Sequence, residues 1–284
     1  MPVLRRAKQS EFILFKRWVW LIALCLSGTQ AFAQAGLTTT PPRIYFHLDP
    51  GGSASHQIRV GNPGNKPLQV AVSLGDWNYD SLGNNKLYNA GTLPTSCARW
   101  LQILPGTFFT VQPNQFVNVV LNVHVPDSIQ KTPGVRTAMV YFTQLNPIGM
   151  GRSAAGAVIR EVVRMGIKVY VSMEPSDTRN VDIENLQLLR KTDTLHQQHL
   201  SLLLGFENSG NVWLAGKISW ELLNLDSGKK TRVPSQDFFS LPGDHRIVLQ
   251  PLPEKLPEGR YSATAIVNYG NKDELKVAEL DFKM

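Results

Sequence analysis

The residues closest to a metal-binding pattern are two histidines, His196 and His199. Imidazole nitrogens bind transition metals, but residues three apart bring both rings to one ion only on a helix or in a tight loop. This pair stands at the start of a predicted strand, with no cysteine near it in sequence and only scattered acids. We therefore interpret it as a solvated strand end, and we predict no metal site and no bound cofactor.

Cys97 and the glycine-rich segment 149–156 are the other candidates for chemistry. A cysteine nucleophile needs an activating neighbour, and no histidine is close to Cys97 in sequence, so we expect a small buried hydrophobe. The glycine segment lacks the spacing of a phosphate-binding loop, and no helix is predicted after it. The chain also has no nucleophile elbow and no conspicuous acid pair. We predict that it is not an enzyme.

Short runs of alternating apolar residues, separated by Pro, Gly, Asn and Asp, make up most of the chain. In the strongest run, 116–125, every second residue from Val117 to Val125 is Val or Leu, so these side chains share one face of a strand. The predicted strands are 43–48, 56–60, 68–74, 116–125, 137–145, 157–171, 181–190, 200–207, 217–225, 246–249, 261–269 and 275–282. No segment keeps a period of 3.6. The pattern predicts an all-β chain with two immunoglobulin-like β-sandwich domains in tandem.

The first 33 residues have the three parts of a secretory signal peptide. Five bases and one acid precede the apolar run 18–26, and Ala31 to Ala33 forms a small-residue cleavage site. The apolar run is about half the ~20 residues that a membrane span needs. We predict cleavage before Gln34 and no transmembrane segment afterwards. A lipoprotein modified at Cys25 is a minor alternative, because Leu24 stands where a small residue would be expected.

Charge and cysteine content narrow the partners and the stabilising forces. Without residues 1–33 the chain keeps 24 Lys and Arg against 21 Asp and Glu, so its net charge is +3 instead of +7. No basic run survives, and no nucleic-acid partner is expected. One cysteine, Cys97, remains, so an intramolecular disulfide is excluded even in an oxidising compartment. Stability must come from two buried cores.

The domain boundary is predicted near residues 173–177, where Glu174 and Pro175 follow the long strand candidate 157–171. This gives an N-terminal domain of residues 34–173 and a C-terminal domain of residues 174–284. Segment 146–156, rich in Gly, Pro and small residues, is predicted to be a mobile loop. In the second domain, Tyr261 after Gly259 is a residue that can cap a sandwich corner.

The first half resembles the PapD-like periplasmic chaperones of the chaperone–usher pilus pathway. The resemblance covers residues 38–173 well and the second domain only in general style. Its landmarks follow the family's order: a first strand with an arginine (40–46), a hairpin of the type N-x-x-x-x-P (60–70), a segment similar to P-x-x-F-x-L-x-P-G-x (104–115), a strand ending in an aromatic pair (137–142), and a last strand similar to K-I-K-L-F-Y (166–170).

The resemblance implies a binding site. In this family a basic pair between two immunoglobulin-like domains binds the C-terminal carboxylate of a pilus subunit, and Arg43 and Lys168 match that pair by motif. An arginine and a lysine that converge on one point favour an anion through charge-assisted hydrogen bonds. For either residue alone, a solvated base at a strand end is the simpler interpretation.

The resemblance also implies a donor strand, which lends apolar side chains to a subunit that lacks a strand. Ile159 and Val163 match that row, with Met165 beside them, and Glu161 departs from it. A carboxylate buried without a partner is costly, so Glu161 argues against simple strand donation. The alternative is that Glu161 protects an exposed edge from self-pairing.

Together these features predict a periplasmic chaperone that is secreted across the inner membrane. Its expected partners are subunits of secreted pili, fimbriae or surface adhesins, and an outer-membrane usher. The subunits are expected to bind by β-strand addition and by capture of their C-terminal carboxylate. The alternative is a cell-envelope interaction or scaffold protein that uses the tandem sandwich for other contacts.

Overall fold

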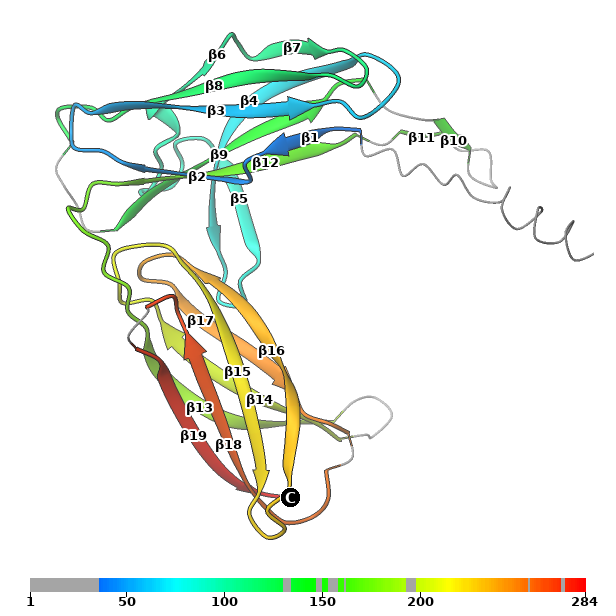
Figure 1. The fold of residues 1–284 in the computed structure, drawn as a ribbon, viewed down its shortest axis with the longest axis vertical. Helices are drawn as coiled ribbons and strands as arrows, with labels where there is room; N and C mark the ends of the chain where they lie inside the picture. Colours follow the sequence, from blue (N-terminus) through cyan, green and yellow to red (C-terminus); the bar gives the residue numbers. More distant parts are fainter. Residues whose placement is uncertain are drawn as a thin grey trace, which may run out of the picture. The chain divides into compact units, whose positions relative to one another are not determined.

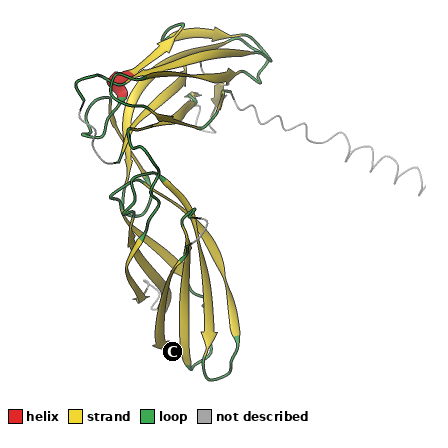
Figure 2. Ribbon diagram, turned by 60° about the vertical axis from the view of Figure 1, so that its left-hand side comes forward, coloured by secondary structure: helices red, strands yellow, loops and turns green. Residues whose placement is uncertain are grey.

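The computed structural model describes residues 36–129, 134–146, 150–152, 158–160, 162–192, 198–254, 256–271 and 274–284. The predicted signal peptide, residues 1–33, lies outside these ranges. The described chain is built almost entirely of β-strands, with one short 3-10 helix, η1 (Ala98–Trp100) (Figures 1 and 2). Among the residues given above, no helix combines the length and the apolar character of a membrane span.

Two sheets form the first sandwich, in the strand orders β1-β3-β8-β6 and β2-β12-β9-β4-β5, and β7 also pairs with β4. Neighbouring strands are antiparallel except for β2 and β12, which run parallel. The bounds are β1 Thr38–Thr40, β2 Arg43–His47, β3 Ser53–Gly61, β4 Leu68–Tyr79, β5 Asn85–Asn89, β6 Leu101–Leu104, β7 Phe108–Val111, β8 Phe116–His124, β9 Val135–Gln144 and β12 Arg164–Ser172.

Strand β8 shows how sequence alternation makes the first core. Val119, Leu121 and Val123 are buried, whereas Phe116 and His124 are exposed. The predicted face is therefore confirmed, because the pleat turns alternate residues toward the facing sheet. The expectation for Cys97 is confirmed too, since this free thiol is fully buried in the same core.

The second sandwich has one sheet in the order β13-β14-β17 and another in the order β16-β15-β18-β19. The bounds are β13 Asp182–Thr192, β14 Gln198–Glu207, β15 Leu214–Asn224, β16 Lys230–Ser240, β17 His245–Pro251, β18 Arg260–Asn268 and β19 Lys276–Lys283. Its core includes Phe206, Trp220 and Tyr261. The Tyr261 hydroxyl donates a hydrogen bond of 2.9 Å to the carbonyl of Pro257, which confirms the tyrosine at a sandwich corner.

The fold is thus all-β, with two immunoglobulin-like sandwiches in tandem. Residues of the first core run from Leu37 to Met173, and those of the second from Val181 to Tyr269. The predicted boundary near residues 173–177 falls at the end of the first core and before the second. The domain limits themselves stay predictions.

The long strand predicted over 157–171 is wrong as a single element. A short strand β11 (Val158–Arg160) pairs with β10 (Met150–Arg152), and Val162 and Val163 belong to no strand before β12 begins at Arg164. The reason is that β9 ends at Gln144, so the backbone of β11 finds its partners in β10 instead. Strand β10 also lies inside segment 146–156, which was predicted to be a loop.

Candidate functional site

The structure brings Arg43 and Lys168 together. The two residues are partners in the parallel register of β2 and β12, and paired strands lie about 4.8 Å apart. Both side chains are half-buried. Within the part of the chain that the structure describes, no carboxylate forms an ion pair with either of them. Two neighbouring cations without a counterion are unusual, because partly buried charges are normally paired.

Lys168 is held by aromatic and polar side chains. Its Nζ donates hydrogen bonds to Tyr79 Oη at 2.9 Å and to Asn85 Oδ1 at 2.7 Å. It also lies 3.9 Å from the centre of the Trp77 ring. Burial, and then the nearby charge of Arg43, lower the pKa of Lys168 from 10.5 to about 8. An ammonium has three N–H donors, so one remains for an added acceptor.

Arg43 is held by the second sandwich. Its guanidinium carbon lies 5.1 Å from the centre of the Trp213 ring and 4.8 Å from that of Phe239. Such contacts orient a cation through the negative faces of the rings. The Arg43 Nε is buried and has no hydrogen-bond partner among the described residues. An unpaired buried donor on a guanidinium is costly.

The hairpin formed by β4 and β5 supplies both polar contacts of Lys168, since Tyr79 ends β4 and Asn85 begins β5. Its tip is tied to the second sandwich by Arg246, which is 3% exposed and donates to the carbonyls of Asp80 at 2.6 Å and Ser81 at 2.9 Å. The hairpin therefore positions the amine and links it to β17. Sequence reasoning missed it, because the segment around Asn85 reads as a loop.

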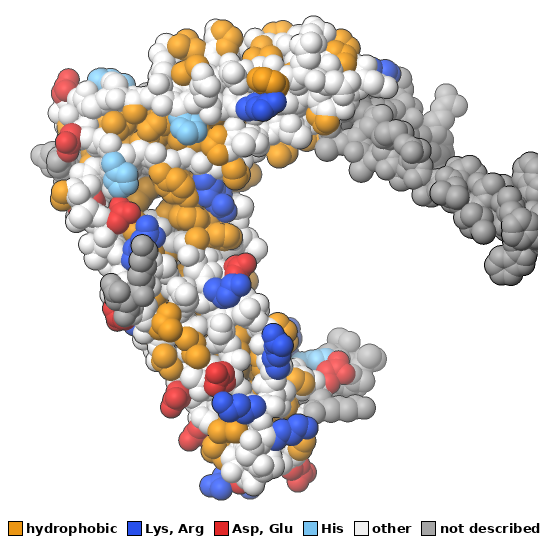
Figure 3. Space-filling model, viewed as in Figure 1, with side chains coloured by type: hydrophobic (Ala, Val, Ile, Leu, Met, Phe, Trp, Pro, Cys, Tyr) orange, Lys and Arg blue, Asp and Glu red, His pale blue; other side chains and the backbone are white. Residues whose placement is uncertain are grey.

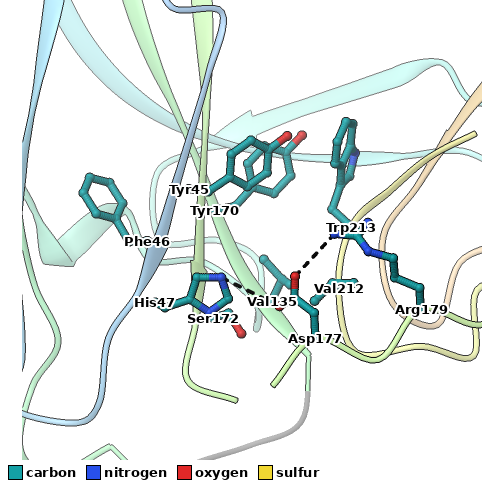
Figure 4. A pocket seen from close by; sticks show the side chains of 10 residues that line it. All are labelled: Tyr45, Phe46, His47, Val135, Tyr170, Ser172, Asp177, Arg179, Val212 and Trp213. Carbon is teal, nitrogen blue, oxygen red and sulfur yellow. Dashed lines mark hydrogen bonds and ion pairs between the residues drawn. The ribbon is translucent and has the colours of Figure 1, made fainter. Parts of the chain in front are cut away.

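Beyond the cationic pair, the same strands carry aromatic residues. Tyr45 and Tyr170 pair two residues further along the same register, and their rings stack with centres 4.7 Å apart. With Trp213 they line a pocket of about 270 Å³, in which Figure 4 shows the two tyrosine rings stacked face to face and Trp213 nearby. Asp177, which also lines the pocket, forms an ion pair with Arg179 at 3.3 Å, and its Oδ1 lies 3.7 Å from His47 Nε2. Burial raises the pKa of Tyr45 to about 12.

One edge of β12 is open beside the cationic pair. All of β12 pairs with β9, but β2 pairs only with its second part, from Lys168 onward. Among the described strands, none pairs with residues 164–167 on the side away from β9. Unpaired backbone N–H and C=O groups on a strand edge accept an added strand.

The predicted donor row is only partly described. Ile159 lies in β11 opposite Gly151, and Glu161 lies outside the described residues. Val163 and Met165 are partly buried against the first core. The structure therefore does not bring Ile159 into one strand with Met165, and the donor role of these residues stays a prediction.

The distribution of charge over the second sandwich is mixed. On the face drawn in Figure 3, basic side chains are interspersed with acidic ones over this part of the molecule. Exposed ion pairs there include Lys217 with Asp237 and Lys230 with Glu221. Such pairs are screened by solvent and contribute little stability.

Comparisons place the fold among known structures. No family model and no curated protein matches the chain. The structure is similar to that of a chaperone–tip adhesin complex of CFA/I fimbriae biogenesis, with 13% identity, a TM-score of 0.45, and coverage of 88% of this chain and 98% of that one. The E. coli chaperone DraB is similar with 16% identity, a TM-score of 0.43, and coverage of 86% of this chain and 98% of that one. A structure of Salmonella enterica SafA pilin in complex with the SafB chaperone is similar with 14% identity, a TM-score of 0.43, and coverage of 89% of this chain and 99% of that one.

Several structures similar to this chain are thus chaperones of the kind that the sequence motifs resemble. At these identities the likeness concerns the fold, and at TM-scores below 0.5 it carries no argument about function. The function is therefore argued from the residues of this chain.

Proposed function

We propose that this protein is a periplasmic chaperone for subunits of secreted fibres or adhesins. Arg43 and Lys168 bind the C-terminal carboxylate of a subunit, and the open edge of β12 pairs with the strand that precedes that carboxylate. The observation that carries the proposal is the pair of partly buried cations without a counterion. It supports an anionic ligand whatever the ligand's size.

The strand edge narrows the ligand from any anion to a peptide end. The unpaired residues 164–167 immediately precede Lys168 in β12. A peptide whose carboxylate meets the cationic pair can therefore continue along this edge with main-chain hydrogen bonds. A small anion would use the two cations and leave the edge empty. The motifs that resemble the pilus chaperones point to the same ligand class.

The test is the binding of a short peptide of alternating valine and threonine, offered with a free C-terminal carboxylate or as its C-terminal amide. We expect the free acid to bind and the amide to bind at least tenfold more weakly. Arg43→Ala and Lys168→Ala should each weaken binding of the acid by about 2 kcal/mol or more, the usual cost of truncating one side of a desolvated charge pair. Circular dichroism should show an unchanged fold.

Arg59→Ala is the matched control. Arg59 also stacks on an aromatic ring, with its guanidinium 3.6 Å from the centre of Phe116, but it lies on β3 in the other sheet of the first sandwich. It should not change peptide binding. If the acid and the amide bind equally and neither Arg43→Ala nor Lys168→Ala weakens binding, the carboxylate mechanism is wrong, and the interaction or scaffold function takes its place.

A further inference from the structure

Three side chains with metal-binding atoms meet on the second sandwich. They are Glu184 of β13, Glu207 of β14 and His245 of β17, and one ligand atom from each lies within 4.8 Å of the other two. The residues are far apart in sequence, so no motif marks them, and they are distinct from His196 and His199. They are also separate from the Arg43–Lys168 pair.

The sheet itself assembles this cluster. Glu207 and His245 are register partners on β14 and β17. On β13 the pairing with β14 shifts between Ile183 and Asn185, which makes Glu184 an additional residue at a β-bulge. Bulges re-aim a side chain without breaking the sheet. Each of three adjacent strands thus contributes one ligand atom, and strands hold ligands more rigidly than loops do.

Two acids face each other at the cluster. Asp182 is the register partner of Glu207, which sets two acids opposite each other. Over the described ranges, no lysine or arginine forms an ion pair with Glu184 or Glu207. Like charges directly opposite each other destabilise a sheet, so a cation at this point would be stabilising.

The three ligand types select a class of cation. An imidazole with two carboxylates suits a borderline transition metal such as Zn²⁺, whereas Ca²⁺ and Mg²⁺ prefer oxygen ligands alone. His245 Nδ1 lies 2.6 Å from Glu184 Oε1. The two atoms form a hydrogen bond or ion pair at this distance. A bound metal ion would replace that contact, and the two atoms would move apart to coordinate the ion. The side chains are exposed by 65% and 39%, which leaves room for water as further ligands.

We propose that Glu184, Glu207 and His245 form a binding site for one Zn²⁺ or a similar divalent transition metal. The competing interpretation is a simple exposed ion pair between His245 and Glu184 with Glu207 beside it. The two differ in stoichiometry and in the role of Glu207, which has no part in the ion pair and is needed as the third ligand of a metal.

The test is titration of the purified protein with Zn²⁺ in a calorimeter, together with Co²⁺ absorption as a report on the ligand set. We expect one bound ion per chain and visible Co²⁺ bands. Glu207→Gln and His245→Gln should each raise the dissociation constant at least tenfold and weaken the bands. His199→Gln is the control, because this exposed histidine lies on the same strand as Glu207 and should leave binding unchanged.

Two results would overturn the proposal. One is the absence of stoichiometric Zn²⁺ binding to the unaltered protein. The other is binding that survives Glu207→Gln and His245→Gln but is lost in His199→Gln, which would place the metal at the strand start instead. Thermal unfolding of each variant without metal shows that the fold is intact, so a lost site and a lost fold can be told apart.

Discussion

At the scale of single residues, the candidate site depends on two cations in different electrostatic situations. Arg43 is oriented by the rings of Trp213 and Phe239, and its Nε has no hydrogen-bond partner among the described residues. Lys168 is different, since burial beside Arg43 lowers its pKa from 10.5 to about 8. In the unbound protein the Lys168 amine is therefore partly neutral in mildly alkaline solution. Binding of an anion there is coupled to the uptake of one proton by this amine.

This difference predicts how binding depends on pH. Affinity for the peptide with a free carboxylate should be constant well below pH 8, where Lys168 is protonated. Above that pH it should fall by about tenfold per unit, because each binding event must take up one proton. The measurement is calorimetric titration between pH 6 and 10 in buffers of equal ionic strength.

The control is Lys168→Arg, which keeps a positive charge over the whole range. Its affinity at pH 7 can be lower because the geometry differs, but its pH profile should be flat. A flat profile for the unaltered protein would show that Lys168 does not contact the carboxylate.

The sequence pointed to Arg43 and Lys168 as a basic pair because each stands in a motif that resembles the pilus chaperones, and these motifs follow the family's order along the chain. It could not identify Tyr79 and Asn85, which contact Lys168 from a hairpin more than 80 residues away in sequence. The ligand cluster on the second sandwich was also missed. Its members meet only through strand register and a bulge, and neither can be read from local pattern.

At the scale of elements, period-two alternation was enough to predict strands with one buried face, such as β8. It failed for β16, which was not predicted because Lys230–Ser240 is largely polar and contains Pro234. The structure explains how this strand forms. It is an edge strand of its sheet, and the register of β15 and β16 shifts between the pairs Ile218–Gln236 and Trp220–Val233, so Pro234 falls at an irregularity where no donor is needed.

The β4–β5 hairpin gives a prediction at this scale. Gly83 near its tip has a φ of +90°, and a Cβ there would overlap the guanidinium of Arg246, which is held by the carbonyls of Asp80 and Ser81. Gly83→Ala should lower the free energy of unfolding by about 2 kcal/mol or more, through backbone strain and the displaced arginine. Urea unfolding followed by circular dichroism measures it.

Gly228→Ala separates the two causes. Gly228 also has a positive φ, of +69°, but a Cβ there would meet no atom within 4 Å. This variant should lose only the backbone contribution, about 1 kcal/mol. Equal losses in the two variants would mean that Arg246 does not hold the hairpin in place.

At the scale of the whole molecule, a third cluster of apolar residues draws on both sandwiches. Trp77, Tyr79 and Tyr170 of the first belong to it together with Leu241 of the second, and Trp213 and Phe239 pack against them. Trp213 lies 5.7 Å from the ring centre of Tyr45 and 5.5 Å from that of Tyr170. The same ring orients Arg43, so packing between the sandwiches and preparation of the cationic site depend on one residue.

The last prediction tests whether the sandwiches are coupled through this cluster. Cys97 is fully buried in the first core, and burial raises the pKa of its thiol, so a thiol reagent reaches it only after the first sandwich opens. If the shared cluster stabilises both sandwiches, Trp213→Ala in the second should lower the urea concentration at which Cys97 is labelled. We expect a loss of about 1 to 3 kcal/mol in the opening free energy that the thiol reports, the range of partly buried large-to-small substitutions.

Leu225→Ala, at an exposed leucine of the second sandwich outside the cluster, is the control and should leave labelling unchanged. An unchanged labelling midpoint in Trp213→Ala would mean that the first sandwich folds independently and that Trp213 serves only to orient Arg43. In that case the variant should still weaken binding of the peptide carboxylate, because the guanidinium would have lost its aromatic support.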